Sequence, residues 1–208
     1  MPARKAPKKK AYHHGDLRRA LLAEALNLVA REGTGAVSLR ELAERVGVSH
    51  AAPYRHFHDK EALFAAVAEE GFRLLQDAEE RARDEAGAEA GARLEGIGVG
   101  YVRFAVGHPG HFKVMFSHIG SPPDDGSDVA TAGRTAFEVL FHGIQEAQGA
   151  GVVAPGDIMQ QALFAWAGVH GLACLLVEGV LARIGPAEPP ELQARRIARL
   201  LIGAVAVR

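Results

Sequence analysis

Apolar residues recur at three- and four-residue steps along most of the chain, which is the spacing of amphipathic helices. Leu17, Leu21, Ala25 and Leu28 show this spacing first, and the later part of the chain has no alternating strand pattern. The pattern therefore predicts an all-α fold. The expected helices cover residues 16–32, 39–46, 60–83, 91–106, 111–118, 128–148, 157–184 and 190–207, with a further helix that begins after Ser49.

Helix-end signals divide the N-terminal part into short elements. Ser38 and Glu41 have the spacing of a capping box, in which a serine caps the helix and a glutamate follows at its third position. Gly47 offers the positive φ that ends this helix, and Ser49 is the expected cap of the next one. Pro53 is then the fourth residue of that helix, where it forfeits at most the first intrahelical hydrogen bond.

Two short helices joined by a glycine turn are typical of a helix-turn-helix, whose second helix enters the major groove of DNA. His50, Ala51 and Ala52 give the predicted second helix a slim leading edge, which lets its backbone approach base edges and thymine methyl groups. Donors for phosphate oxygens follow at Tyr54, Arg55, His56 and Lys60.

The charge of the chain is divided unevenly, although its net value is only -1. Residues 1–60 contain twelve Lys and Arg against six Asp and Glu, whereas residues 61–208 contain twelve against nineteen. A basic front and an acidic remainder indicate that the front meets a polyanion. The alternative is that the lysine-rich tail, which holds much of the excess, only aids solubility.

The stretch from Tyr12 to about Leu75 resembles the DNA-binding domain of the tetracycline-repressor (TetR) family. The family pattern is matched by Gly47, Val48, Ser49, Tyr54, Phe57, Lys60 and Leu63. Ala51 stands where the family usually has glycine, and Pro53 stands where it usually has an aliphatic residue. These two departures leave the expected fold intact, but base specificity is not carried over by analogy.

The resemblance also indicates which residues contact DNA. It implies Tyr54, His56 and Lys60 as contacts to the DNA backbone, and residues 49–52 with Arg55 as contacts to base edges. The complete set of candidate DNA-binding residues is Ser38, Arg40, Ser49, His50, Ala51, Ala52, Tyr54, Arg55, His56 and Lys60.

The C-terminal part has two stretches that resemble a TetR subgroup marked by Trp, His and Gly (WHG), namely residues 108–116 and 166–175. In that subgroup this part forms a ligand pocket and a dimer interface. The predicted helix 157–184 is apolar nearly all round from Ala162 to Leu181, so we expect it to be buried on every side. Together with the amphipathic helix 190–207, it could form half of a four-helix bundle with a second copy of the chain.

Aromatic residues on these helices have two interpretations, a plain core or an apolar cavity for a small, largely apolar effector. On the second interpretation Met115 is adaptable lining, and His170, His142 or His111 is the polar group that orients the ligand. The candidate ligand-binding residues are Phe104, Phe112, Met115, Phe116, Phe137, Phe141, Trp166 and His170. The glycines of segment 91–106 indicate either a deformable wall beside this cavity or close helix packing, and the sequence does not decide between them.

Other chemistries lack a supporting pattern. His111, Met115 and His118 share a helical face near His108, Asp124 and Asp125, but no defined metal-ligand spacing accompanies them, so neither metal nor cofactor is expected. The chain shows no phosphate-binding glycine loop and no G-x-S-x-G elbow, and its single cysteine lies in an apolar helix, so we expect no enzyme.

The sequence thus predicts a basic disordered arm (1–12), a helix-turn-helix domain (13–72) and a domain for ligand binding and dimerisation (73–208). No apolar run looks long enough to span a bilayer, and no apolar core follows the basic N-terminus, so the cytoplasm is the expected compartment. The predicted function is a homodimeric regulator that binds a palindromic operator as a ligand-released repressor. The alternatives are a non-specific architectural DNA binder, or a carrier or enzyme with a helix-turn-helix-like front.

Overall fold

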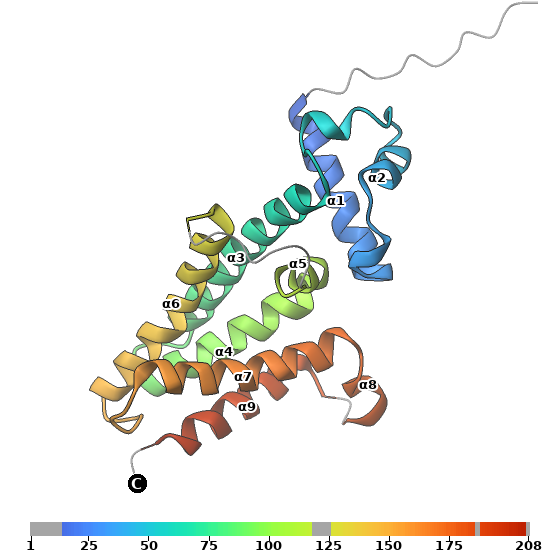
Figure 1. Ribbon diagram of the computed structural model, residues 1–208. Coiled ribbons are helices and arrows are strands. Elements are labelled where there is room, and N and C mark those ends of the chain that lie inside the picture. The colour runs from blue at the N-terminus through green and yellow to red at the C-terminus, as the bar shows by residue number, and fades with distance from the viewer. Residues whose placement is uncertain (1–13, 118–125, 186–187, 207–208) are drawn as a thin grey trace, which may run out of the picture. The chain divides into compact units, whose positions relative to one another are not determined.

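The computed structural model describes residues 14–117, 126–185 and 188–206, and within them every regular element is a helix (Figure 1). An isolated bridge between Val153 and Ala206 is the one β-type pairing in this part of the chain. The all-α prediction is therefore confirmed. The chain divides into two compact units after Leu63. The predicted arm 1–12 and most of the predicted loop 121–128 lie outside the described residues.

The first unit is built from short helices around a small apolar core. It contains α1 (His14–Glu32), the 3₁₀ turn η1 (Thr34–Ala36), α2 (Leu39–Val46), the 3₁₀ turn η2 (Pro53–Arg55) and the first residues of α3 (Lys60–Glu85). α1 packs against α2, and the apolar face predicted for α1 is buried. Leu21, Leu42 and Leu63 are fully buried in the core of this unit.

The predicted ends of α2 are confirmed atom by atom. The Oγ atom of Ser38 accepts a hydrogen bond from the Glu41 N–H at 3.1 Å. Gly47 adopts φ 77°, and the Val48 N–H donates to the Ala43 carbonyl across 2.9 Å. This bond closes the helix in the manner of a Schellman motif, which requires the left-handed conformation that glycine adopts without strain.

The third helix is not the α-helix that the sequence predicts, because residues 49–52 form a turn and only Pro53–Arg55 is helical, of the 3₁₀ type. In an α-helix the Ser49 carbonyl would accept from the N–H of Pro53, and proline has none. The carbonyl accepts instead from Ala52 at 2.9 Å, one residue earlier, and the His56 N–H likewise bonds to Pro53 at 2.9 Å. Ser49 makes no side-chain cap, so this part of the prediction is also wrong.

The second unit is a larger helical bundle in which α4 lies at the centre. It contains the rest of α3 with α4 (Ala90–Gly107), α5 (Pro109–Met115), α6 (Asp128–Gly149), α7 (Ile158–Val177), α8 (Leu181–Ile184) and α9 (Pro190–Ala204). α4 packs against α5, α6, α7 and α9, and most of its residues from Leu94 to Ala105 are buried. α7 and α9 run side by side (Figure 1).

Close packing explains two glycines of α4, Gly96 and Gly100, and so supports the packing interpretation at these two positions. A Cβ atom on Gly96 would lie 2.5 Å from the Ala82 carbonyl oxygen of α3. A Cβ on Gly100 would lie 2.5 Å from the Ala78 oxygen and 2.7 Å from the Glu79 Cα. Any side chain at these two positions would therefore push α3 and α4 apart.

The predicted helix 157–184 is two helices, so that expectation is wrong. Gly179 has φ 66° and its N–H donates to the Leu176 carbonyl at 3.0 Å, while Val180 donates to Leu175 at 2.9 Å. These two bonds form a Schellman motif that ends α7 before α8 begins. The longest helix of the described chain is instead α3, with 26 residues.

The prediction that this helix is buried on every side does not hold for α7 in the single chain. Met159, Leu163 and Phe164 are each 46% exposed, and Leu175 is exposed as well. With 20 residues and a mean hydropathy of 1.3, α7 is also long and apolar enough to cross a bilayer, contrary to the expectation that no such run exists. A core helix of a soluble protein has the same length and composition, so this property alone assigns no membrane span.

Candidate functional site

The segment from Ser49 to Arg55 presents the predicted recognition residues at the surface of the first unit. Ser49, His50, Ala51 and Arg55 are exposed and Ala52 is half-buried. Two apolar anchors hold the segment from behind, because Pro53 is fully buried and Phe57 is only 4% exposed. The guanidinium carbon of Arg18 lies 5.4 Å from the centre of the Phe57 ring, which ties this anchor to α1.

Tyr54 is 57% exposed, so its side chain lies at the surface rather than in the core. Phe57 belongs to the core. Ser38 and Arg40 are exposed at the start of α2. His56, two residues after Tyr54, is half-buried.

The basic side chains of this surface already have acidic or carbonyl neighbours. Glu44 of α2 lies 3.0 Å from the His50 Nε2 atom and 3.6 Å from the Arg40 Nε atom. The ammonium group of Lys60 donates to the Thr34 carbonyl at 2.8 Å and so links the start of α3 to η1. Glu44 therefore competes with any phosphate for two of the candidate contacts.

An apolar cavity of about 230 Å³ lies within the second unit. Helices α3, α4, α6 and α7 and the residue after α5 form its wall. The lining residues are Phe72, Leu75, Glu79, Tyr101, Phe116, Gly133, Ala136, Phe137, Leu140 and Trp166. A second cavity of about 30 Å³ shares Glu79, Tyr101, Leu140 and Trp166 with it, so these four side chains form a common wall.

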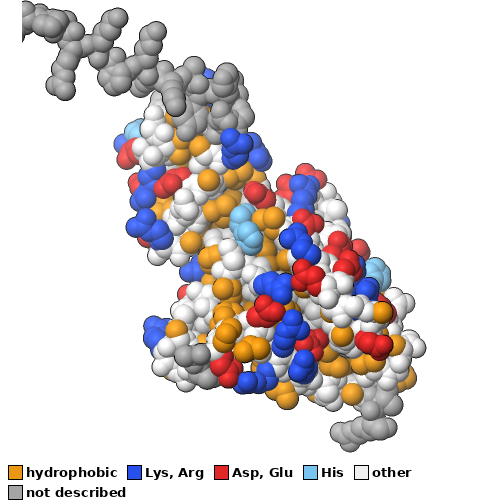
Figure 2. All heavy atoms as spheres, turned by 180° about the vertical axis from the view of Figure 1, so that it is seen from behind, with side chains coloured by type: hydrophobic (Ala, Val, Ile, Leu, Met, Phe, Trp, Pro, Cys, Tyr) orange, Lys and Arg blue, Asp and Glu red, His pale blue; other side chains and the backbone are white. Residues whose placement is uncertain are grey.

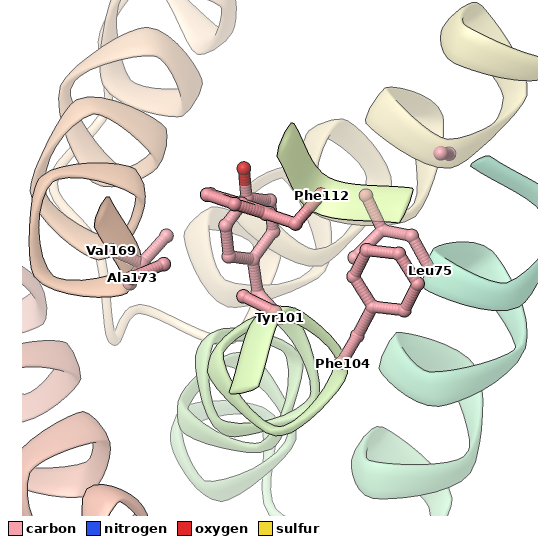
Figure 3. Close-up of a cluster of buried hydrophobic side chains, with 8 residues drawn as sticks. Leu75, Tyr101, Phe104, Phe112, Val169 and Ala173 are labelled. Carbon is pink, nitrogen blue, oxygen red and sulfur yellow. The ribbon is translucent and has the colours of Figure 1, made fainter. Parts of the chain in front are cut away.

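Three of the eight predicted ligand-binding residues lie on the cavity, namely Phe116, Phe137 and Trp166. Phe104 and Phe112 are instead buried in the apolar core next to it. Figure 3 shows that core, with Tyr101 and Phe104 extending from α4 toward Phe112 of α5.

The other predicted ligand-binding residues lie away from the lining. Met115 packs against Gly71 of α3, and the ring of Phe141 lies 5.9 Å from that of His142. His170 lies beside the cavity wall, with its ring 4.6 Å from the Phe116 ring and 5.4 Å from the Trp166 ring.

A hydrogen-bond chain joins His170 to the cavity wall. The Trp166 Nε1–H donates to the Tyr101 hydroxyl at 3.2 Å, and that hydroxyl lies 2.7 Å from His170 Nδ1. Burial raises the pKa of the Tyr101 phenol and lowers the pKa of His170, so both groups are neutral near pH 7. In the His170 tautomer whose Nδ1 accepts the Tyr101 proton, the Nε2–H is directed at the Cys174 sulfur 3.5 Å away.

Glu79 is the functional candidate that the sequence analysis missed. Its side chain lines both cavities although it is only 4% exposed, and its Oε2 atom has no hydrogen-bond partner in the described part of the chain. Burial raises the pKa of this carboxyl group well above its ordinary value, with a smaller contribution from Glu80. A signal was present in the sequence, because Phe72, Leu75 and Ala82 place Glu79 on the apolar stripe of α3.

Other buried charge in this unit is paired. Glu95 of α4 accepts hydrogen bonds from Arg195 at 3.2 Å and from Arg199 at 2.7 Å, which ties α4 to α9.

Figure 2 shows basic and acidic side chains interspersed over the visible face of the molecule rather than separated by sign. Among the described residues no three His, Cys, Asp or Glu side chains are grouped to hold a metal ion, while His118, Asp124 and Asp125 lie outside them.

The outer face of α7 is apolar and exposed, and exposed leucines of α9 lie among arginines of the same helix. These leucines are Leu192 and Leu200. A groove of about 440 Å³ runs along the two helices, between Gly168 and Gly171 on one side and Arg196 and Ile197 on the other. Contiguous apolar surface of this kind marks a site of association.

Comparison with known proteins agrees with both parts of this description. The family described as bacterial regulatory proteins of the tetR family matches residues 21–67, and the family described as the tetracyclin repressor-like C-terminal domain matches residues 94–201. No curated protein matches the chain significantly.

Solved structures share the fold over nearly the whole chain. A Rhodococcus sp. RHA1 protein of unknown function is 38% identical, with 96% of this chain and 100% of that chain covered and a TM-score of 0.79. A regulatory protein of the tetR family from Rhodococcus RHA1 is 23% identical, covering 92% and 98% of the two chains with a TM-score of 0.74. The TetR family transcriptional regulator PfmR from Thermus thermophilus is 21% identical, with 90% and 98% covered and a TM-score of 0.73.

The second of the two family matches alone spans more than half of the chain, and the first falls on the helices that carry the exposed recognition segment. The chain therefore belongs to the TetR family of bacterial transcription regulators.

Proposed function

We propose that the protein is a cytoplasmic repressor that binds a palindromic operator as a homodimer and leaves it when a small, largely apolar effector binds. Membership of the TetR family makes it a DNA-binding transcription regulator of a non-enzymatic family. The observation that carries the proposal is the exposed segment 49–55, held from behind by buried Pro53 and Phe57.

In this proposal residues 49–52 and Arg55 contact base edges, while Ser38, Arg40, Tyr54 and His56 contact phosphates. An exposed turn with small side chains can approach the floor of the major groove closely. The ammonium group of Lys60 donates to the Thr34 carbonyl, and in this proposal the same group also contacts a phosphate. The domain assignment is a DNA-binding part up to about residue 72 and an effector-binding, dimerising part beyond it.

The homodimer forms through the exposed apolar face of α7 and α9. A monomer would leave Leu163, Phe164 and Leu200 in water, and a second copy of the same face would bury them. Two copies also supply the two recognition segments that a palindromic operator requires.

Release depends on α3, which contributes Lys60 to the first unit and Phe72, Leu75 and Glu79 to the cavity wall. An effector that binds the released state better shifts the equilibrium between the two states. A coupling free energy of about 1–3 kcal/mol is typical of such regulation.

The test is fluorescence anisotropy with the DNA upstream of the protein's own gene and with a shuffled duplex, over a series of salt concentrations. We expect the first duplex to bind about a thousandfold more tightly or better. Arg55→Ala should remove this preference, whereas Arg73→Ala, an exposed arginine of the second unit, should keep it. Equal and strongly salt-dependent binding to both duplexes would instead support an architectural DNA binder.

A further inference from the structure

We propose that the cavity of the second unit selects organic cations, that is, small and largely apolar molecules with a protonated nitrogen that binds Glu79. This inference rests on the proposal that the cavity is an effector site. It goes further by naming the chemical class of the effector and the residue that selects it.

The carboxyl group of Glu79 is buried without the partner that such a group normally has. Glu79, Glu95 and His111 are the buried polar or charged side chains in the described ranges. Glu95 is bonded to two arginines, whereas Glu79 faces the two cavities and its Oε2 atom has no partner there. An unpaired buried carboxyl group destabilises a fold, so its place on a cavity wall indicates a partner that arrives from outside.

No positive group of the described chain supplies that partner. The charged neighbour that acts on Glu79 is Glu80, which has the same sign. His170 is the basic side chain of the hydrogen-bond chain beside the cavity wall. It is neutral near pH 7 because burial lowers its pKa. The local field therefore favours a ligand that brings its own positive charge.

The second polar group on the wall is also an acceptor. The Tyr101 hydroxyl receives the Trp166 N–H, and with the His170 tautomer whose Nδ1 accepts the Tyr101 proton only a lone pair remains for a ligand. Glu79 and Tyr101 thus both suit a ligand that donates hydrogen bonds. A protonated amine can take the place of the proton that burial keeps on Glu79, whereas an anion would meet the Tyr101 lone pair and, once Glu79 loses its proton, a second negative charge.

Aromatic rings complete a site for a cation. Phe72, Tyr101, Phe116, Phe137 and Trp166 all line the cavity. Phe72 and Phe116 meet edge to face at 6.0 Å, and Phe137 meets Trp166 in the same way at 6.3 Å. Ring faces carry partial negative charge, and aromatic cages of this kind bind alkylammonium groups.

Glycine at position 100 brings Glu79 to this place. A Cβ on Gly100 would lie 2.7 Å from the Glu79 Cα, so the absence of a side chain on α4 lets α3 approach. The cavity of about 230 Å³ is small for a ligand site, which favours a compact amine over a lipid-sized molecule.

The experiment uses three probes of similar shape and different charge with the full-length protein: 2-phenylethylamine (cation), propylbenzene (neutral) and 3-phenylpropanoate (anion). Trp166 is the single tryptophan of the chain and lies on the cavity wall, so its fluorescence reports binding directly. At pH 7 we expect the amine to bind more tightly than propylbenzene and the carboxylate to bind least.

Substitution at Glu79 then tests the residue. Glu79→Gln should weaken binding of the amine about 10- to 100-fold, as loss of a charged hydrogen bond does, and leave propylbenzene unchanged or tighter. Asp77→Asn is the matched control, because Asp77 is an exposed carboxyl group on the same helix that lines neither cavity, and it should leave all three affinities unchanged. The charge series on the unmodified protein remains decisive if a variant fails to fold.

Equal binding of the three probes, tighter binding of the carboxylate, or no binding of the amine would each overturn the inference. None of these results bears on operator binding, which is measured without a ligand. Conversely, loss of the operator preference described above would overturn the proposed function while a preference for cations could still be observed.

Discussion

Tyr101 of α4 and His170 of α7 are joined by a hydrogen bond of 2.7 Å between the phenol oxygen and Nδ1. The same oxygen accepts from Trp166, so one hydroxyl group bonds to the ring nitrogens of two half-buried side chains. This arrangement orients three rings at the cavity wall and makes the hydroxyl difficult to replace.

Tyr101→Phe should therefore destabilise the protein, because it leaves the Trp166 and His170 nitrogens without their partner. The expected loss is about 1–3 kcal/mol in the free energy of unfolding, measured by urea denaturation. Tyr54→Phe removes a hydroxyl from an exposed ring and should change the stability by less than about 0.5 kcal/mol. If the two variants were equally stable, the hydrogen-bond chain would have no energetic role.

The pH dependence of stability should reveal Glu79. Its pKa in the folded state is raised above the ordinary 4.5, so the folded protein holds a proton that the unfolded chain releases. This contribution to stability is present at low pH and is lost as the pH rises from about 4.5 through the folded pKa. Glu79→Gln removes the titration, so the variant should gain stability relative to the original protein as the pH rises.

The measurement compares the pH dependence of stability between Glu79→Gln and the original protein, instead of interpreting the curve of one protein alone. Burial lowers the pKa of His111 and His170, so their contribution to the free energy of unfolding increases as the pH rises, opposite to that of Glu79. They are unchanged in Glu79→Gln, so they cancel in the difference between the two proteins. Glu80 of α3 is the charged group that acts on Glu79, and Glu80→Gln should lessen the effect without abolishing it.

The sequence predicts the structure best at helix ends, where local signals act alone. Ser38 and Gly47 fix the ends of α2 through bonds within three to five residues, and both are observed as predicted. At the start of α3 the Asp59 Oδ1 atom accepts from the Ala62 N–H at 2.7 Å in the same way. Gly179 carries the same kind of signal, but a long apolar run hid it.

The site is less accessible to sequence reasoning because its parts come from different helices. Phe116, Phe137 and Trp166 are aromatic residues of the kind that lines a cavity, and so are Phe104 and Phe112, which lie in the core. Only packing decides between these positions. Glu79 could have been noticed on its apolar stripe, but the absence of a partner is a property of the folded chain.

Gly100→Ala should destabilise the protein, because the new methyl group would meet the Ala78 carbonyl oxygen at 2.5 Å. Overpacking against a backbone costs about 1–3 kcal/mol, and it should also move Glu79 and weaken the binding of 2-phenylethylamine. Gly107→Ala is the matched control at the end of the same helix, where nothing lies within 4 Å, and it should be neutral or slightly stabilising. Urea denaturation of both variants makes the comparison, and equal stabilities would contradict the close approach of α3 and α4.

Phe164→Glu should convert the protein to a monomer if the face of α7 and α9 is the dimer interface. Phe164 is 46% exposed in the single chain, and a buried charge at its position would oppose association. Val106→Glu places the same charge on another exposed apolar residue, on α4, and should leave the dimer intact. Analytical ultracentrifugation distinguishes the two masses, and a dimeric Phe164→Glu protein would place the interface elsewhere.

Pro53→Leu should turn the recognition segment into a regular α-helix. The substitution supplies the N–H that the Ser49 carbonyl lacks at the α-helical position, so that this carbonyl no longer has to bond to Ala52. Leucine also keeps an apolar anchor at a fully buried position. Hydrogen exchange followed by NMR should then show a protected amide at residue 53, and His50 and Ala51 should be rotated relative to Tyr54. Because these residues are the proposed base contacts, the variant should retain its affinity for non-specific DNA and change its operator preference. An unprotected amide at residue 53 would mean that the 3₁₀ path is set by the anchor Phe57 rather than by proline.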